Sequence, residues 1–184
     1  MNKTEYPLLG EAVYAHTLPC GLEIRVIPKQ GFAKTYAFLA ANYGSVDMTF
    51  RDGDELVQAP AGVAHYLEHK MFDLPEGNAM QQFAATGASP NAFTSYAMTA
   101  YYFDCTDRFE ENLRLLLHFV TTPYFTQESV EKERSIIAQE IRMYEDSAGS
   151  ACFEQLAQAM YAHHPLRVPI AGTVESIQAI TPEL

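Results

Sequence analysis

The first half of the chain has the pattern of short strands that lead into a single helix. Residues 22–27 alternate between apolar and polar side chains, and this two-residue period predicts a strand. A Pro-Cys-Gly turn precedes it, and another apolar run lies before the turn. From residue 61 to about residue 72 the period changes, because Ala64, Leu67 and Met71 form one apolar stripe of a helix. The expected strands of this half cover residues 13–18, 22–27 and 35–43.

From residue 78 onward the chain alternates between helices and strands. The segment Tyr101-Tyr102-Phe103 has the aromatic composition of a core strand. The apolar positions after it repeat every 3.6 residues, and Asp107 is expected to cap the helix that they form. Strands are expected over residues 92–95 and 98–105, and helices over residues 78–85, 107–120, 128–146 and 152–161.

The last residues of the sequence have the order of a helix start. Thr181, Pro182 and Glu183 offer a cap, a proline at the first helical position and an acid. We therefore expect these 184 residues to be a fragment of a longer chain, truncated before the last elements of the domain.

Length and composition place the chain among soluble globular proteins. Its 184 residues suffice for one domain with a hydrophobic core, and 48% of them are hydrophobic and 19% charged. The formal net charge of -11 argues against a nucleic-acid partner and against anionic membranes, since both select basic surfaces. No segment approaches the ~18 apolar residues of a membrane span.

The cysteines and the N-terminus bear on the location. Cys20, Cys105 and Cys152 are odd in number, far apart and without CxxC spacing, so we expect neither a disulfide framework nor a zinc finger. We interpret each as a small buried apolar residue. The N-terminus lacks the basic start and apolar run of a signal peptide. These features predict a reducing, cytoplasmic location and no membrane partner.

The segment His65-Tyr66-Leu67-Glu68-His69 has the spacing of a metal site. Residues four apart on a helix have Cβ atoms about 5–6 Å apart, so both imidazoles can reach one ion. A catalytic zinc usually takes three protein ligands, so a third ligand must come from elsewhere. Glu68 lies close to such an ion, and its carboxylate can accept a proton from zinc-bound water. By the motif alone, a helix with surface histidines and a surface glutamate remains an open alternative.

A pair of glutamates in the predicted 128–146 helix is the second candidate feature. Glu133 and Glu140 are seven residues apart and fall two turns apart on one face, with apolar residues between them. Carboxylates beside a buried stripe are unfavourable unless a partner or a metal satisfies them. The alternative is a pair of surface carboxylates bonded to Arg134 or Arg142, and the spacing leaves both interpretations open.

His-x-x-Glu-His is the signature of the inverzincin metallopeptidases, and here the chain resembles the pitrilysin and insulinase family, which includes the mitochondrial processing peptidases. The resemblance extends over nearly the whole chain. It implies an α+β fold with a mixed, largely antiparallel sheet packed against helices, and one zinc-binding catalytic-type domain over residues 1–184. The segments that carry it are Gly62–Phe72, Asn91–Ser95 with Tyr101–Phe103, Glu133–Glu140, and His164-Pro165 with Gly172-Thr173.

The resemblance also implies which residues form the site. One Zn2+ per chain is expected on His65, His69 and Glu140, with Glu68 as general base and acid. Glu133 is implied to support catalysis by orienting a ligand or the water. An extended peptide is expected to add to an edge strand through main-chain hydrogen bonds. The implied substrate-binding residues are Asn91, Ala92 and Phe93.

The implied function is that of a zinc-dependent metalloendopeptidase acting on peptides or unfolded polypeptide segments. Family members have two similar halves that close around the substrate, so a second homologous half or subunit is the expected partner. The alternative is a noncatalytic partner or scaffold subunit of a heterodimeric peptidase. Such subunits typically lose part of the motif, whereas this sequence keeps every position, which favours the enzyme.

Overall fold

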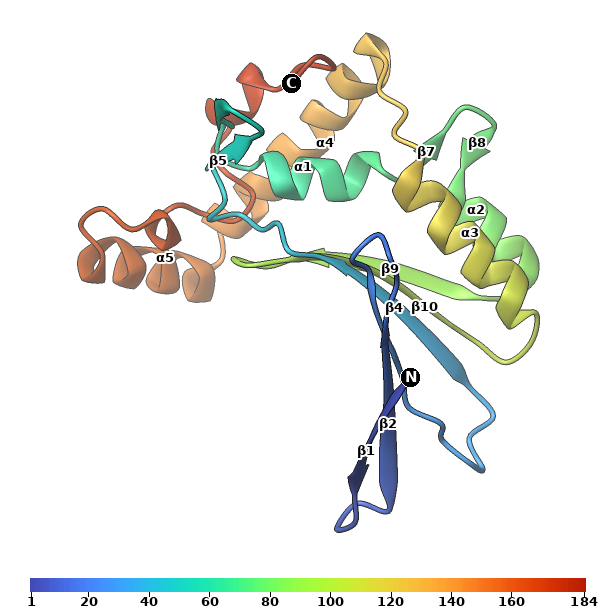
Figure 1. Cartoon of the computed structure of the whole chain (residues 1–184). Coiled ribbons are helices and arrows are strands. Elements are labelled where there is room, and N and C mark those ends of the chain that lie inside the picture. Colours follow the sequence, from blue (N-terminus) through green and yellow to red (C-terminus); the bar gives the residue numbers. More distant parts are fainter. The chain divides into compact units, whose positions relative to one another are not determined.

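The computed structural model describes residues 1–184, which divide into two compact units, Met1–Thr35 and Tyr36–Leu184 (Figure 1). The first unit is an antiparallel sheet in the order β1-β2-β3. Its strands are β1 (Asn2–Tyr6), β2 (Glu11–Thr17) and β3 (Glu23–Val26). The two strands predicted over residues 13–18 and 22–27 are therefore confirmed. The sequence pattern does not predict β1, because all its side chains are exposed and show no alternation.

The second unit is built on a three-stranded sheet in the order β4-β10-β9. Its strands are β4 (Thr35–Ala41), β10 (Thr99–Cys105) and β9 (Ser89–Thr94). The aromatic segment predicted as a core strand lies in β10, the central strand, where Tyr101 and Phe103 are buried. β9 pairs antiparallel with β10, with Thr94 opposite Thr99, and forms one edge of the sheet.

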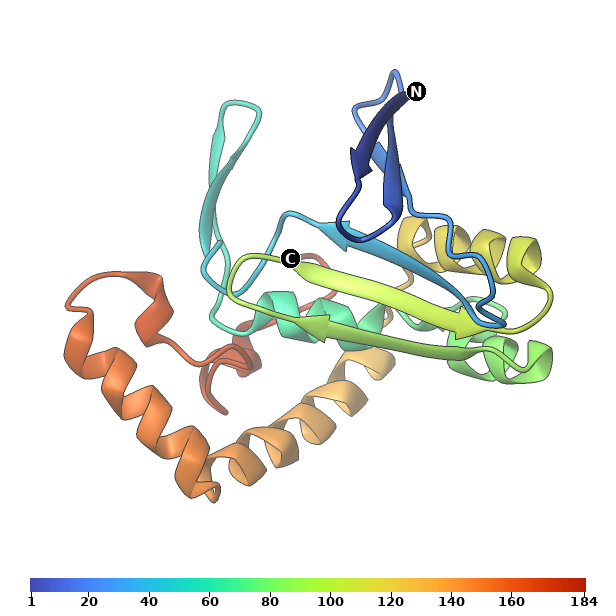
Figure 2. The same ribbon diagram turned by 90° about the horizontal axis from the view of Figure 1, so that it is seen from below.

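Three helices cover one face of this sheet (Figures 1 and 2). They are α1 (Val63–Lys70), α2 (Ala79–Thr86) and α3 (Phe109–Thr121). An aromatic core joins α2 and α3 to β10, in which the ring of Phe119 stacks on Phe72 at 5.0 Å and meets Tyr101 edge-on. Full burial of each such side chain contributes about 1.5–3 kcal/mol. α1 lies against β9 and β10, and the Tyr101 hydroxyl donates to the Leu67 carbonyl of α1 at 3.4 Å.

Two further helices, α4 (Gln127–Glu145) and α5 (Ala148–Met160), form the arms of a V (Figure 2). A capping box begins α4, because the Thr126 hydroxyl accepts the Ser129 N–H while the Ser129 hydroxyl accepts the Thr126 N–H. Two short 3₁₀ helices follow, η1 (Pro165–Arg167) and η2 (Ser176–Ala179). None of the helices combines the length and apolar composition needed to cross a membrane.

A second core holds α4 across α1. Tyr66 of α1 packs with Val130 and Ile137 of α4, and all three are almost fully buried. The Tyr66 hydroxyl also donates to the main-chain carbonyl of Val130. The relative position of the two helices is thus set by apolar packing and by a buried hydrogen bond.

Two glycines allow a close backbone approach at the start of α1. Gly62 and Gly172 have φ of +92° and +72°, which side-chain-bearing residues rarely adopt. A Cβ on Gly62 would lie 2.4 Å from the Ala171 carbonyl oxygen, and a Cβ on Gly172 would lie 2.4 Å from that of Ala61. The Ser176 hydroxyl donates to the same Ala61 carbonyl at 2.8 Å. The segment around residue 172 therefore clasps the N-terminus of α1, one turn before His65.

The predicted α+β fold with a largely antiparallel sheet is confirmed, with some local differences. The hairpins β5 (Thr49–Asp52)–β6 (Glu55–Gln58) and β7 (Asp73–Leu74)–β8 (Gly77–Asn78) are not predicted, because they are short and polar. Asp107 does not cap α3, since Arg108 occupies that position at φ 55°. α5 begins four residues before the predicted start at 152, because Ser147 caps it. Of the three cysteines only Cys105 is buried, so the interpretation of Cys20 and Cys152 as buried was wrong.

Candidate metal centre

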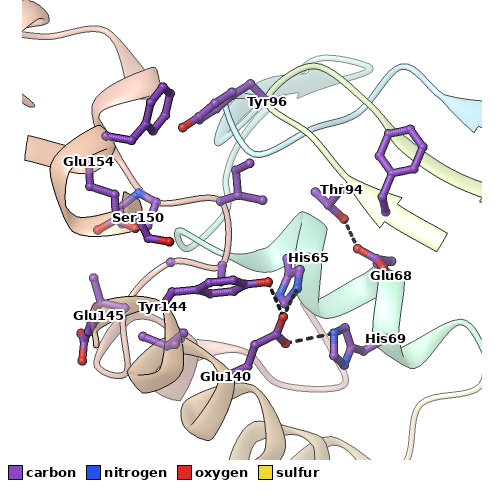
Figure 3. Close-up of a pocket in the computed structure, with 18 of the residues that line it drawn as sticks. His65, Glu68, His69, Thr94, Tyr96, Glu140, Tyr144, Glu145, Ser150 and Glu154 are labelled. Atoms are coloured by element: carbon purple, nitrogen blue, oxygen red, sulfur yellow. Dashed lines mark hydrogen bonds and ion pairs between the residues drawn. The ribbon is translucent and has the colours of Figure 1, made fainter. Parts of the chain in front are cut away.

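Two histidines of α1 and one glutamate of α4 point into the same space (Figure 3). His65 and His69 lie one turn apart, with ring centroids separated by 4.7 Å. Oε1 of Glu140 is 3.6 Å from Nε2 of His65, and Oε2 is 3.4 Å from Nε2 of His69. One potential ligand atom from each residue lies within 4.8 Å of the other two. These three side chains form a candidate metal group.

The chemistry and spacing of this group fit a zinc ion. Two atoms that each lie about 2.0–2.1 Å from a tetrahedral ion are about 3.3–3.4 Å apart. The two nitrogen–oxygen separations here, each to a different oxygen of Glu140, are 3.4 and 3.6 Å, and the three ligand atoms lie within 4.8 Å of one another. Two imidazoles and one carboxylate are a donor set of catalytic zinc sites, which leaves a fourth position for water. Nδ1 of His65 is buried without a hydrogen-bond partner in the protein, so Nε2 is its one nitrogen facing another polar group.

Glu133 contacts His69 from the side away from Glu140. Nδ1 of His69 and Oε1 of Glu133 are 2.8 Å apart, so the other ring nitrogen, Nε2, faces Glu140. A metal-binding histidine is commonly oriented in this way, with one ring nitrogen bonded to a carboxylate and the other directed at the metal. Burial lowers the pKa of His69, but the hydrogen bonds and charges of Glu133 and Glu140 outweigh it and raise the pKa to about 10. In the metal-free protein this imidazole is therefore protonated at neutral pH.

Glu140 is held as an anion by its neighbours. The close contacts with the imidazoles of His65 and His69 keep its pKa well below the usual range, against the opposing effect of burial. Tyr144, one turn later on α4, donates its hydroxyl to Oε1 of Glu140 at 2.8 Å. That bond, together with burial, raises the pKa of Tyr144 to about 12, so its hydroxyl remains a donor. The carboxylate is thus ready to bind a cation.

Glu68 lies on the β9 side of the site and is not part of the candidate metal group (Figure 3). Its Oε2 accepts a hydrogen bond from the Thr94 hydroxyl at 2.6 Å. Of the protein's groups, Thr94 is the one that donates to this carboxylate. A free oxygen on the carboxylate remains for a proton or a water.

A cleft of about 880 Å³ contains these groups. One side is formed by β9 through Ala92, Phe93 and Thr94, and the opposite side by α5 and residues 169–173. Two of the predicted substrate-binding residues, Ala92 and Phe93, therefore line the cleft. Asn91 does not, and its side chain accepts the main-chain N–H of Ala92 at 2.8 Å.

The structure thus brings together His65, His69 and Glu140. Glu133 contacts His69, and Glu68 lies beside the group. The alternative partners of the glutamates are not used. Arg134 donates instead to the Ile180 carbonyl, and Glu133 and Glu140 form ion pairs with the two histidines and not with Arg142. Sequence reasoning missed the contacts of Thr94 and Tyr144. The position of Tyr144 four residues after Glu140 was a usable signal, whereas nothing in the sequence pairs Thr94 with Glu68.

Comparisons with known proteins agree with this geometry. Residues 57–174 match the insulinase family, described as peptidase family M16. The chain is 47% identical over 182 residues to the "Uncharacterized zinc protease YmfH" of Bacillus subtilis (strain 168), covering 98% of this chain and 42% of that protein. A crystal structure of a protein described as an M16-like peptidase from Alicyclobacillus acidocaldarius superposes with a TM-score of 0.91 at 44% identity, over 98% of this chain and 42% of that one.

The crystal structure of pitrilysin shares the fold, with a TM-score of 0.71 at 21% identity over 91% of this chain and 18% of that chain. The chain therefore spans less than half the length of these relatives. The family match covers most of the chain, including both histidines, Glu68 and Glu140. The chain belongs to the insulinase family of peptidases, peptidase family M16.

Proposed function

We propose that this chain is the catalytic part of a zinc-dependent metalloendopeptidase that hydrolyses peptides or unfolded segments. The observation that carries the proposal is the convergence of His65, His69 and Glu140 beside Glu68 in a cleft bordered by an edge strand. The zinc protease to which the chain is 47% identical supports it. The complete set of motif residues favours an enzyme over a noncatalytic partner subunit.

Each protein group has a defined part in this proposal. His65, His69 and Glu140 would hold one zinc ion, which when bound lowers the pKa of a water ligand to about 7 and polarises a substrate carbonyl. Glu68 takes the proton from the attacking water and passes it to the leaving amine. Glu133 holds the imidazole of His69 in orientation through their 2.8 Å contact.

The edge of β9 is the proposed site of substrate binding. Its backbone pairs with β10 on one side only, and Ala92 and Phe93 line the cleft. An extended peptide can add to such an edge by main-chain hydrogen bonds. The side chain of Asn91, which accepts the Ala92 N–H, would release it when a peptide binds.

We further propose that these residues form one half of a longer chain or assembly, with a second homologous half closing the cleft. The 42% coverage of the YmfH protein supports this proposal. The activity is therefore to be measured on the full-length protein, meaning the complete chain of which these residues would be a part. The cytoplasmic location and the absence of nucleic-acid and membrane partners stay predictions from the sequence.

A peptidase assay with a matched variant tests the proposed function. The full-length protein is expected to cleave a quenched fluorescent peptide, to lose activity on zinc removal and to regain it when zinc is restored. Glu68→Gln is expected to abolish hydrolysis while zinc stays bound, because the amide cannot accept the proton. A Glu68→Gln protein as active as the unsubstituted one would refute the mechanism, and a zinc-loaded protein that cleaves no peptide would refute the function.

A further inference from the structure

Thr94 makes the contact that holds Glu68 in place. Its hydroxyl donates to Oε2 of Glu68 at 2.6 Å, within the roughly 2.5–2.7 Å range of hydrogen bonds from a hydroxyl to a carboxylate (Figure 3). Such charge-assisted bonds are about twice as strong as neutral ones.

The same residue is the last one of the edge strand β9. The main-chain N–H of Ser95 donates to the Met98 carbonyl at 2.8 Å, and hydrogen-bonded pairs alternate along an antiparallel ladder. Thr94 and Thr99 are therefore a pair without mutual hydrogen bonds. The main-chain N–H and carbonyl of Thr94 accordingly point away from β10, toward the open edge.

The hydrogen bond of the Ala92 main-chain N–H supports this orientation of the β9 backbone. Ala92 lies two residues before Thr94 and has the same orientation, and its N–H is bonded to the Asn91 side chain rather than to β10. Both residues line the cleft. The backbone of Thr94 thus faces the place where a peptide strand would add, while its side chain reaches Glu68 on α1.

We propose that Thr94 is a positioning residue that couples the docking of a peptide on β9 to the orientation of the Glu68 carboxylate. This inference rests on the proposed function. A peptide bonded to the main chain of Thr94 fixes that residue, and the fixed hydroxyl in turn holds Glu68 where it can take the proton. The hydrogen bond therefore affects the chemical step more than the binding of the substrate.

Three variants of the full-length protein separate this role from a general structural one. Thr94→Val keeps the shape and removes the donor, and Thr94→Ser keeps the donor and removes a methyl group. Thr99→Val is the matched control, because Thr99 lies directly opposite in the hairpin and its hydroxyl donates to the Tyr43 carbonyl at 2.9 Å. The control removes a threonine hydrogen bond from the same hairpin without touching Glu68.

The measurement is the steady-state hydrolysis of a peptide, with zinc content determined for each variant. Thr94→Val is expected to lower kcat by about 10- to 100-fold with KM and zinc content nearly unchanged, as misplacement of a catalytic group does. Thr94→Ser and Thr99→Val are expected to keep kcat within a small factor of the unsubstituted value. The inference is overturned if Thr94→Val keeps full kcat, or if Thr99→Val or Thr94→Ser lowers kcat as much as Thr94→Val does.

Crystal structures of the same variants provide a readout that does not need activity. The Glu68 carboxylate is expected to keep its position in Thr94→Ser and to move or lose order in Thr94→Val. An unsubstituted protein that cleaves no peptide would refute the proposed function without deciding this contact. A Glu68 carboxylate that stays in place in Thr94→Val would refute the positioning role whether or not the protein is a peptidase.

Discussion

Replacing Gly62 by alanine is expected to weaken both the fold and the site, because Gly62 lies where the chain clasps the start of α1. Its φ of +92° is unfavourable for alanine by roughly 1–2 kcal/mol. The added Cβ would also lie 2.4 Å from the Ala171 carbonyl oxygen, whereas ordinary contact begins at 3.4 Å. The backbone at residue 171 must therefore move by about 1.0 Å (3.4 − 2.4), and overpacking of this kind typically costs about 1–3 kcal/mol.

Gly87 provides the matched control for this prediction. It also has a positive φ, +77°, but a Cβ there would meet nothing within 4 Å. Gly87→Ala should therefore show the backbone strain alone, about 1–2 kcal/mol. Gly62→Ala should show that strain and the collision, about 2–5 kcal/mol in all.

The assay is guanidinium unfolding of the metal-free protein, with the free energy of unfolding obtained from midpoint and slope. Zinc affinity should also fall in Gly62→Ala, since His65 lies one turn after the clasp, and should stay unchanged in Gly87→Ala. Equal destabilisation by the two substitutions would refute the argument from close approach.

Two further predictions concern the metal group. Glu133→Gln should weaken zinc binding by about 10- to 100-fold, because the carboxylate that orients His69 is lost; a chelator competition measures this, and an unchanged affinity would contradict it. Zinc uptake at neutral pH should release about one proton from His69, whose pKa is about 10 without metal. Affinity should therefore rise with pH up to that value, and calorimetry in buffers of different ionisation enthalpy counts the proton; pH-independent binding would contradict the assignment.

The sequence predicts those parts of the site that lie close together along the chain. The spacing of His65 and His69 determines their shared face once α1 forms, and α1 forms where the helical period appears. The period also predicts α4 to within a residue at each end, and with it the common face of Glu133 and Glu140. Local periodicity is a strong signal because helix geometry alone sets these distances.

Contacts between distant segments are not predictable in this way. That α4 crosses α1 so that Glu140 faces both histidines depends on the burial of Tyr66, Val130 and Ile137, which no local pattern specifies. The pairing of Glu140 with the two histidines was therefore expected from the resemblance to the family and not from local geometry. The clasp of Gly62 and Gly172 and the bond from Thr94 to Glu68 likewise join residues far apart in sequence.

Polar hairpins are the elements that the sequence pattern left out. β5 and β6 expose nearly all of their side chains, so they lack the alternation that marks a half-buried strand. The prediction that Cys20 and Cys152 are buried was wrong for a similar reason. Burial of cysteine is a statistical preference, and the segments around these two residues do not belong to a core. The predicted cytoplasmic location stays a prediction.

The most direct test of the central claim is a zinc titration of the metal-free protein, carried out beside the Glu140→Gln variant. We predict one zinc ion per chain for the unsubstituted protein. Mutation of a residue that only orients a metal ligand weakens zinc affinity by roughly 10- to 100-fold. Removal of the ligand Glu140 itself should weaken the affinity by at least as much. A protein that takes up no zinc, or a Glu140→Gln variant that binds it equally tightly, would contradict the account.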